Sequence, residues 1–179
     1  MLQNYSTWKV ARVFFDEPAE DHYLTEISKK SDLAHTSVKK HLEKLIGIGI
    51  IEEKELERGE RTYPIYNSRV DDEKYKEYRK IDIQHRLYES GLVQYIEERC
   101  HPDCIVLFGS SARGEDVGES DIDLYVQADE HEVDMSPYEK SLNRNIQLHF
   151  QEDLRDYPKE LRNNIANGIV MYGYLEVYR

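Results

Sequence analysis

The architecture of this chain is indicated by two short stretches, Phe-Gly-Ser-Ser-Ala-Arg-Gly at residues 108–114 and Ser-Asp-Ile-Asp-Leu at residues 120–124. The first closes an apolar run, which predicts a buried strand that breaks into a tight, phosphate-sized loop. The second begins a strand predicted over residues 121–126, in which Asp121 and Asp123 point to the same face. Two neighbouring carboxylates repel each other unless a cation lies between them. The pattern therefore favours metal-assisted phosphate chemistry over its alternative, a polar surface turn between two ordinary strands.

This spacing resembles that of the DNA polymerase β-like nucleotidyltransferase superfamily, and most closely that of its minimal nucleotidyltransferases. The family pattern Gly-Ser-x-Ala-Arg-Gly, followed by Ser-Asp-x-Asp-Leu, is met here in full, and the resemblance extends over residues 85–179. It implies a small mixed sheet that binds a nucleoside triphosphate, expected to be ATP, with Mg²⁺ or Mn²⁺ and transfers a nucleoside monophosphate. By position, it implies triphosphate binding by Gly109, Ser110 and Arg113. It also implies that Asp121 and Asp123 hold the metal and act in catalysis.

The same resemblance implies a third carboxylate on a later strand, which the sequence places over residues 145–150. The matching residue is Gln147, whose amide binds magnesium weakly and cannot act as a general base. His149 lies two residues further along, on the same face, and is the candidate for a replacement catalytic base or ligand. Alternatively, both are polar positions of a site whose chemistry is weakened or lost. Glu152 and Asp153 qualify only if the strand register is shifted.

The chain is acidic and hydrophilic, with 179 residues, a net charge of −12 and a mean hydropathy of −0.77. No apolar run approaches the length that spans a bilayer, and the first residues lack the basic and apolar regions of a signal peptide. We therefore expect a cytoplasmic protein without a membrane partner. Cys100 and Cys104 have no second ligand pair at zinc-binding spacing, so we interpret them as packing residues rather than as a zinc site or a disulfide.

The N-terminal part predicts three helices followed by a hairpin. Apolar spacing and β-like runs predict helices at residues 5–15, 23–31 and 35–46 and strands at residues 50–56 and 61–66. This order resembles a winged helix-turn-helix domain, whose third helix enters the major groove of DNA and whose hairpin touches the phosphate backbone. It implies DNA contacts from the third helix and the hairpin, with His41 as a further candidate beside Thr36, Ser37, Lys39, Lys40, Lys44, Arg58 and Arg61.

Charge is distributed unevenly between the two parts of the chain. Residues 1–70 carry 11 Lys and Arg against 12 Asp and Glu, whereas residues 71–179 carry 13 against 24. The acidic second part repels nucleic acid, so any DNA contact is expected from the first. DNA-binding modules are usually more basic than residues 1–70. An alternative therefore remains, in which the helix and hairpin faces are solvated surfaces used for protein contacts.

The remaining segments complete the expected fold. Apolar residues at intervals of three and four predict one long helix over residues 71–99, which can pair with its copy in a homodimer. Another helix is expected over residues 154–165, despite Pro158. We therefore expect an α+β protein with a winged helix-turn-helix domain at residues 1–70, the connecting helix, and a small mixed-sheet nucleotidyltransferase domain at residues 100–179.

Two functions fit these features. In the first, the protein is a DNA-binding transcriptional regulator whose second domain binds a nucleotide with Mg²⁺ and transfers it weakly, because Gln147 stands at the third carboxylate position. In the second, it is an active nucleotidyltransferase of the antitoxin type, which modifies a partner toxin protein or a small molecule. The pair formed by Asp121 and Asp123 favours the second function, whereas the winged helix and Gln147 favour the first.

Overall fold

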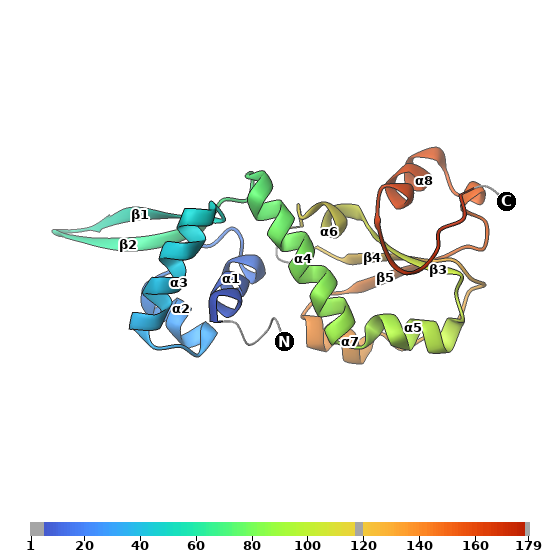
Figure 1. Ribbon diagram of the computed structural model, residues 1–179, viewed down its shortest axis with the longest axis horizontal. Helices are drawn as coiled ribbons and strands as arrows, with labels where there is room; N and C mark the ends of the chain where they lie inside the picture. Colours follow the sequence, from blue (N-terminus) through green and yellow to red (C-terminus); the bar gives the residue numbers. More distant parts are fainter. Residues whose placement is uncertain (1–5, 117–119, 178–179) are drawn as a thin grey trace. The chain divides into compact units, whose positions relative to one another are not determined.

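The computed structural model describes residues 6–116 and 120–177, and the chain divides into two compact units, Met1–Arg79 and Lys80–Arg179 (Figure 1). The boundary falls inside helix α4 (Glu73–Glu89), which contributes Tyr75 to one hydrophobic core and Leu87 to another. Each unit therefore has a core of its own. No helix within the described ranges is both long and apolar enough to cross a membrane.

The first unit consists of three helices and a hairpin: α1 (Ser6–Asp16), α2 (Leu24–Ser31), α3 (His35–Ile48), β1 (Ile51–Arg58) and β2 (Arg61–Ser68). Each helix buries one apolar face, so that Phe14, Ile27 and Leu42 meet in one core. α3 continues two residues beyond its expected end and stops at Gly49, which adopts a φ of +92° that favours glycine. Tyr5, the first residue of the expected first helix, lies outside the described residues.

The hairpin pairs β1 and β2 in antiparallel register from Ile51 opposite Ser68 to Arg58 opposite Arg61. A further bridge joins His22, in the segment between α1 and α2, to Tyr66 in β2. This bridge connects the base of the hairpin to the segment between the first two helices. Most residues towards the hairpin tip are exposed.

The second unit is a four-stranded mixed sheet with strand order β5-β4-β3-β6. β4 and β5 are parallel, and the other two pairs are antiparallel. The central strand β3 is buried throughout because side chains pack on both of its faces, with Leu107 in one cluster and Val106 in the other. The elements are α5 (Leu92–Cys100), β3 (Cys104–Phe108), α6 (Gly109–Arg113), β4 (Ile122–Val126), α7 (Ser136–Leu142), β5 (Ile146–Phe150), the 3₁₀ helix η2 (Leu154–Asp156), α8 (Lys159–Ala166) and β6 (Ile169–Gly173).

Two of the expected helices are wrong in extent. The single connecting helix over residues 71–99 is instead α4 and α5, because Gly91 adopts a left-handed φ of +78° that a continuous helix excludes. The helix expected over residues 154–165 is divided into η2 and α8, with Pro158 as the residue before α8. Proline lacks the N–H that a helix interior needs, and it disfavours helical backbone in the preceding residue.

Candidate nucleotide and metal site

The expected phosphate loop lies where β3 ends. Gly109 has a φ of +73°, and a Cβ atom placed on it would lie 2.6 Å from Asp123 Oδ2. Both the backbone conformation and this close approach therefore require glycine. The glycine backbone lies against the side chain of Asp123, so the loop and a carboxylate meet at one point.

The two aspartates lie side by side at the start of β4. Asp121 directly precedes the strand and Asp123 is its second residue, so both side chains project from the same face and are half-buried. In the sheet, Asp123 lies opposite Phe108 of β3 and next to Gln147 of β5. This register brings the start of the expected phosphate loop, the two aspartates and the β5 residues together.

Gln147 lies where the third carboxylate was expected, and it contacts the first aspartate. Its Nε2 donates a hydrogen bond to Asp121 Oδ2, and Asn145 Nδ2 donates to Asp121 Oδ1 at 3.1 Å. Two amides thus engage the two carboxylate oxygens of Asp121. An amide brings no negative charge to this position, so Gln147 orients Asp121 but cannot take a proton there.

His149 faces the second aspartate. Its Nε2 lies 3.4 Å from Asp123 Oδ1, and this buried nitrogen has no hydrogen-bond partner. The ring packs edge-on against Phe108, with a centroid separation of 5.1 Å. Phe108 therefore holds a nitrogen beside a carboxylate oxygen, an arrangement that a proton or a metal ion would complete.

The other two expected nucleotide ligands are Ser110 and Arg113. Ser110 is half-buried in the first turn of α6. Arg113 is exposed at the end of α6, and its Nε donates to Glu115 at 2.7 Å. The structure therefore brings Gly109, Asp121 and Asp123 close together. The Arg113 guanidinium is instead paired with the neighbouring carboxylate of Glu115.

A buried ion pair that the sequence motif does not predict supports the aspartates. Arg144 and Asp116 form a salt bridge with side-chain exposures of 10% and 1%. The same guanidinium donates to the carbonyl oxygens of Ser120 at 2.7 Å and Asp121 at 3.0 Å, and to Ser111 Oγ at 2.9 Å. Arg144 thus connects both ends of the loop between α6 and β4. The only signal in the sequence is a pair of opposite charges flanking the motif, without a diagnostic spacing.

Comparison with known families identifies the second unit. A family model described as "Polymerase beta, Nucleotidyltransferase" matches residues 90–175. This segment is a polymerase β-like nucleotidyltransferase domain. No curated protein and no solved structure matches the chain. The match covers the phosphate loop, both aspartates and the β5 residues, and it leaves the first unit unassigned.

The nucleotidyltransferase domain offers a partial set of metal ligands. Family members use a divalent metal ion and a nucleoside triphosphate, and Mg²⁺ is commonly held by one or two carboxylates together with substrate phosphates. Asp121 and Asp123 could supply those carboxylates, and the unpartnered Nε2 of His149 lies beside Asp123. The residues present therefore fit a metal ion whose remaining ligands would come from the nucleotide.

The candidate DNA contacts lie in the first unit. His41 is turned inward, since its Nδ1 lies 2.9 Å from Thr7 Oγ1, and burial, with the charges of Lys44 and Lys40, lowers its pKa. The guanidinium of Arg58 lies 5.8 Å from the ring centroid of Tyr23. Ser37 is half-buried, and the remaining candidates are exposed on α3 or the hairpin: Thr36, Lys39, Lys40, Lys44, Arg58 and Arg61.

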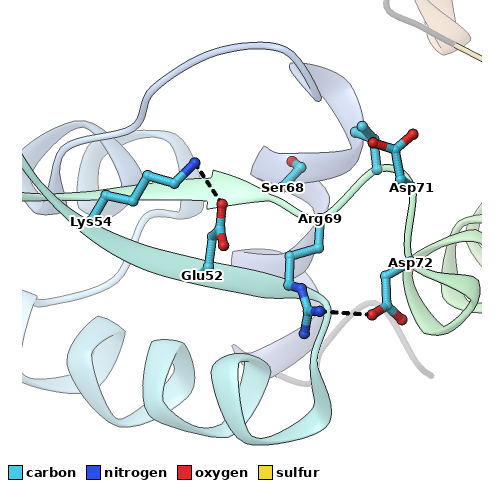
Figure 2. A pocket seen from close by; sticks show the side chains of 7 residues that line it. Glu52, Lys54, Ser68, Arg69, Asp71 and Asp72 are labelled. Atoms are coloured by element: carbon cyan, nitrogen blue, oxygen red, sulfur yellow. Dashed lines mark ion pairs between the residues drawn. The ribbon is translucent and has the colours of Figure 1, made fainter.

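Two other features of the described residues do not add to the site. A cavity of about 510 Å³ at the base of the hairpin is lined by two ion pairs, Glu52 with Lys54 and Arg69 with Asp72, and by Asp71 (Figure 2). In the nucleotidyltransferase domain, Cys104 is a free thiol whose burial, aided by Asp103, raises its pKa to about 11. A thiol of that pKa is uncharged at neutral pH, so it packs rather than reacts.

We expect Arg144→Gln to destabilise the nucleotidyltransferase domain by about 3–5 kcal/mol, because it removes the guanidinium charge that faces the buried Asp116 carboxylate. Chemical denaturation of the full chain measures the loss of stability. Hydrogen exchange of the native protein, read in peptides covering residues 120–126, shows whether this segment opens more often. Arg155→Gln removes an exposed ion pair with Asp153 and is the matched control, expected to leave exchange unchanged. Equal exchange in the two variants would show that Arg144 does not hold the Asp121 segment.

Proposed function

We propose that this protein is a DNA-binding transcriptional regulator in which a winged helix-turn-helix domain is fused to a nucleotidyltransferase domain that binds ATP with Mg²⁺ or Mn²⁺. The convergence of Gly109, Asp121 and Asp123 carries the nucleotide part of this proposal. Gly109 lets phosphate oxygens approach the backbone, and the aspartates would hold the metal. When bound, the metal would neutralise the charge that develops on the phosphates and on the pyrophosphate leaving group.

We propose further that transfer is weak, for a reason that lies in β5. An acceptor hydroxyl must lose its proton as it attacks the α-phosphate, and Gln147 cannot accept that proton. Its hydrogen bond to Asp121 keeps that carboxylate oriented, so nucleotide binding can persist. The domain would then act as a nucleotide sensor more than as a transferase.

The DNA-binding part is supported by the helix order and by exposed basic residues on α3. Lys39, Lys40 and Lys44 are solvent-exposed on the helix that would enter the major groove. β1 works against strong backbone contact, because it carries four glutamates within Ile51–Arg58. Specific contacts from α3 would therefore contribute more to binding than the hairpin does.

A homodimer is part of this proposal. Ile81 and Tyr88 of α4 are seven residues apart, so they lie on one helix face, and they are 47% and 54% exposed. Large apolar side chains exposed on one face are suited to a self-complementary contact across a two-fold axis. Two α3 helices would then meet two halves of a DNA site.

One observation favours the second candidate function, an active nucleotidyltransferase of the antitoxin type that modifies a partner toxin protein or a small molecule. The unpartnered Nε2 of His149 lies beside Asp123, where an imidazole can accept a proton from an attacking hydroxyl. In that case His149 replaces the missing carboxylate, and Gln147 has no effect on the rate.

Nucleotide binding should depend on metal. ATP should raise the melting temperature of the full chain only with Mg²⁺ or Mn²⁺ present, by an amount equivalent to about 2.7 kcal/mol at a hundredfold excess over Kd. Asp121→Asn with Asp123→Asn should abolish the shift. The control is Asp129→Asn with Glu130→Gln, which removes two exposed charges after β4. An undiminished shift in the first double variant would refute the site.

DNA binding should be strongly salt-dependent, because lysine–phosphate contacts release counterions. Duplexes selected from a random pool by the wild-type chain should lose binding in gel shifts with Lys39→Glu and Lys40→Glu. Lys140→Glu with Lys159→Glu makes the same charge change at exposed sites of the second unit and should bind nearly normally. Equal loss in both double variants, or failure to select any duplex at low salt, would contradict a role for α3.

The rate of transfer distinguishes the two functions. Pyrophosphate release from ATP should be slow in the wild type and should rise in Gln147→Asp, since a positioned base typically contributes about 10²–10⁴-fold. His149→Ala should change the rate little. Brisk wild-type turnover that His149→Ala eliminates would instead establish the antitoxin-type enzyme and reject the weakened site.

A further inference from the structure

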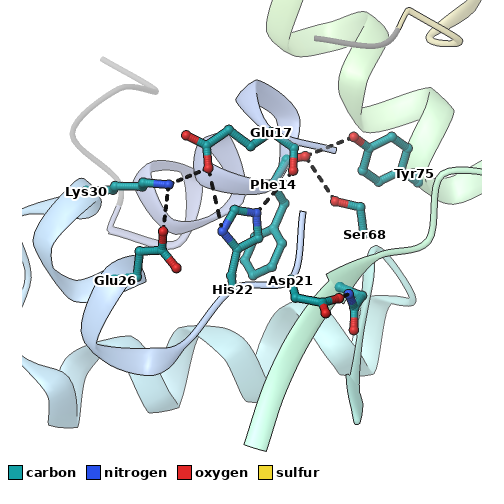
Figure 3. A network of polar contacts seen from close by, with 9 residues as sticks. Phe14, Glu17, Asp21, His22, Glu26, Lys30, Ser68 and Tyr75 are labelled. Atoms are coloured by element: carbon teal, nitrogen blue, oxygen red, sulfur yellow. Dashed lines mark hydrogen bonds and ion pairs between the residues drawn. The ribbon is translucent and has the colours of Figure 1, made fainter. Parts of the chain in front are cut away.

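The first unit contains a second cluster of metal-ligating side chains, remote in sequence from the nucleotidyltransferase domain. Glu17, His22 and Glu26 each offer one ligand atom, and these atoms lie within 4.8 Å of one another (Figure 3). Among the residues that the structure describes, no other group of three His, Cys, Asp or Glu side chains meets this distance. The ligands come from the residue after α1, the segment bridged to β2, and α2.

The histidine is held as metal-binding histidines usually are. Its side chain is fully buried, packs edge-on against Phe14 and has Nε2 3.1 Å from the carbonyl oxygen of Glu17. A carbonyl only accepts, so Nε2 carries the proton and Nδ1 presents its lone pair. A backbone carbonyl on one imidazole nitrogen commonly fixes the tautomer that ligates metal through the other.

That Nδ1 atom lacks a partner. It is buried without a hydrogen bond, and it faces Glu17 Oε2 at a distance of 3.8 Å. A lone pair and a carboxylate oxygen facing each other repel unless a cation lies between them. This orphaned nitrogen is an observation independent of the two glutamates, and it points to a ligand.

Lys30 satisfies only part of the cluster. Its Nζ contacts Glu17 Oε2 and lies 3.3 Å from Glu26 Oε1. Burial favours the neutral amine, but the hydrogen bonds to Glu17 and Glu26 outweigh it and raise the pKa of Lys30. The single positive charge of the ammonium group therefore balances only one of the two carboxylate charges, and it leaves His22 Nδ1 unsatisfied. Its side chain is 34% exposed, so it can turn into solvent when another cation enters.

We propose that Glu17, His22 and Glu26 form a Zn²⁺ site. The ammonium group of Lys30 competes with the metal ion for the two carboxylates. One imidazole nitrogen and two carboxylate oxygens, with a water molecule as the fourth ligand, match the coordination that zinc accepts. The ion would join α1, α2 and the bridge to the hairpin, and so would stabilise the first unit. The proposal rests on neither nucleotide nor DNA binding.

Zinc titration of the full chain by calorimetry tests the site, in a background of Asp121→Asn with Asp123→Asn so that the second unit offers no carboxylate pair. We expect one equivalent of Zn²⁺ to bind. Glu26→Gln, an exposed and nearly isosteric change, should weaken binding at least tenfold, as should His22→Gln. His35→Gln, at an exposed position, is the matched control and should have no effect.

Two further variants and probes complete the test. Lys30→Gln should tighten zinc binding, because it removes the competing cation, and bound Co²⁺ should give the visible absorption of a tetrahedral site that Glu26→Gln removes. Absence of zinc binding would overturn the proposal. Binding that neither Glu26→Gln nor His22→Gln weakens would also overturn it, because the ion would then lie elsewhere. Weaker binding in Lys30→Gln would reject the lysine as a competitor.

Discussion

The contact between Gly109 and Asp123 is the constraint on which the candidate site depends. The antiparallel register places Phe108 opposite Asp123, so the residue after Phe108 must turn away beside a carboxylate. A Cβ atom at Gly109 would come within 2.6 Å of Asp123 Oδ2, and the φ of +73° adds strain for any other residue. Any side chain here would displace the carboxylate or the loop. The glycine therefore sets the distance between the candidate phosphate loop and the candidate metal ligands.

β5 determines what this arrangement can do chemically. Its parallel pairing with β4 places Gln147 beside Asp123, and its amide reaches Asp121. An amide preserves the hydrogen bonding of the site but supplies neither charge nor a proton acceptor. His149, two residues further along, carries a ring nitrogen that can accept a proton, but this nitrogen lies beside Asp123 and not beside Asp121. In the proposed function, nucleotide binding and transfer would therefore be separable, because different residues would support them.

Local sequence patterns predicted the strands and the shared face of the aspartates well. The apolar run that ends in glycine corresponds to β3, and the run that begins with aspartate corresponds to β4. The later strand that the family resemblance implies over residues 145–150 corresponds to β5. The break at Gly91 was missed because the apolar intervals continue across it, and only the backbone conformation reveals it. The ion pair of Arg144 with Asp116 was missed because it joins residues 28 apart through tertiary packing. The orientation of His22 Nδ1 likewise depends on a carbonyl contact that no spacing encodes.

Anomalous diffraction from crystals of the full chain with Mn²⁺ and a non-hydrolysable ATP analogue would locate the metal and the triphosphate relative to Gly109, Asp121 and Asp123. We expect a manganese peak bonded to Asp121, Asp123 and phosphate oxygens, with the triphosphate against the backbone of Gly109. A bound analogue whose triphosphate lies away from Gly109, or a map without manganese at the two aspartates, would contradict this expectation.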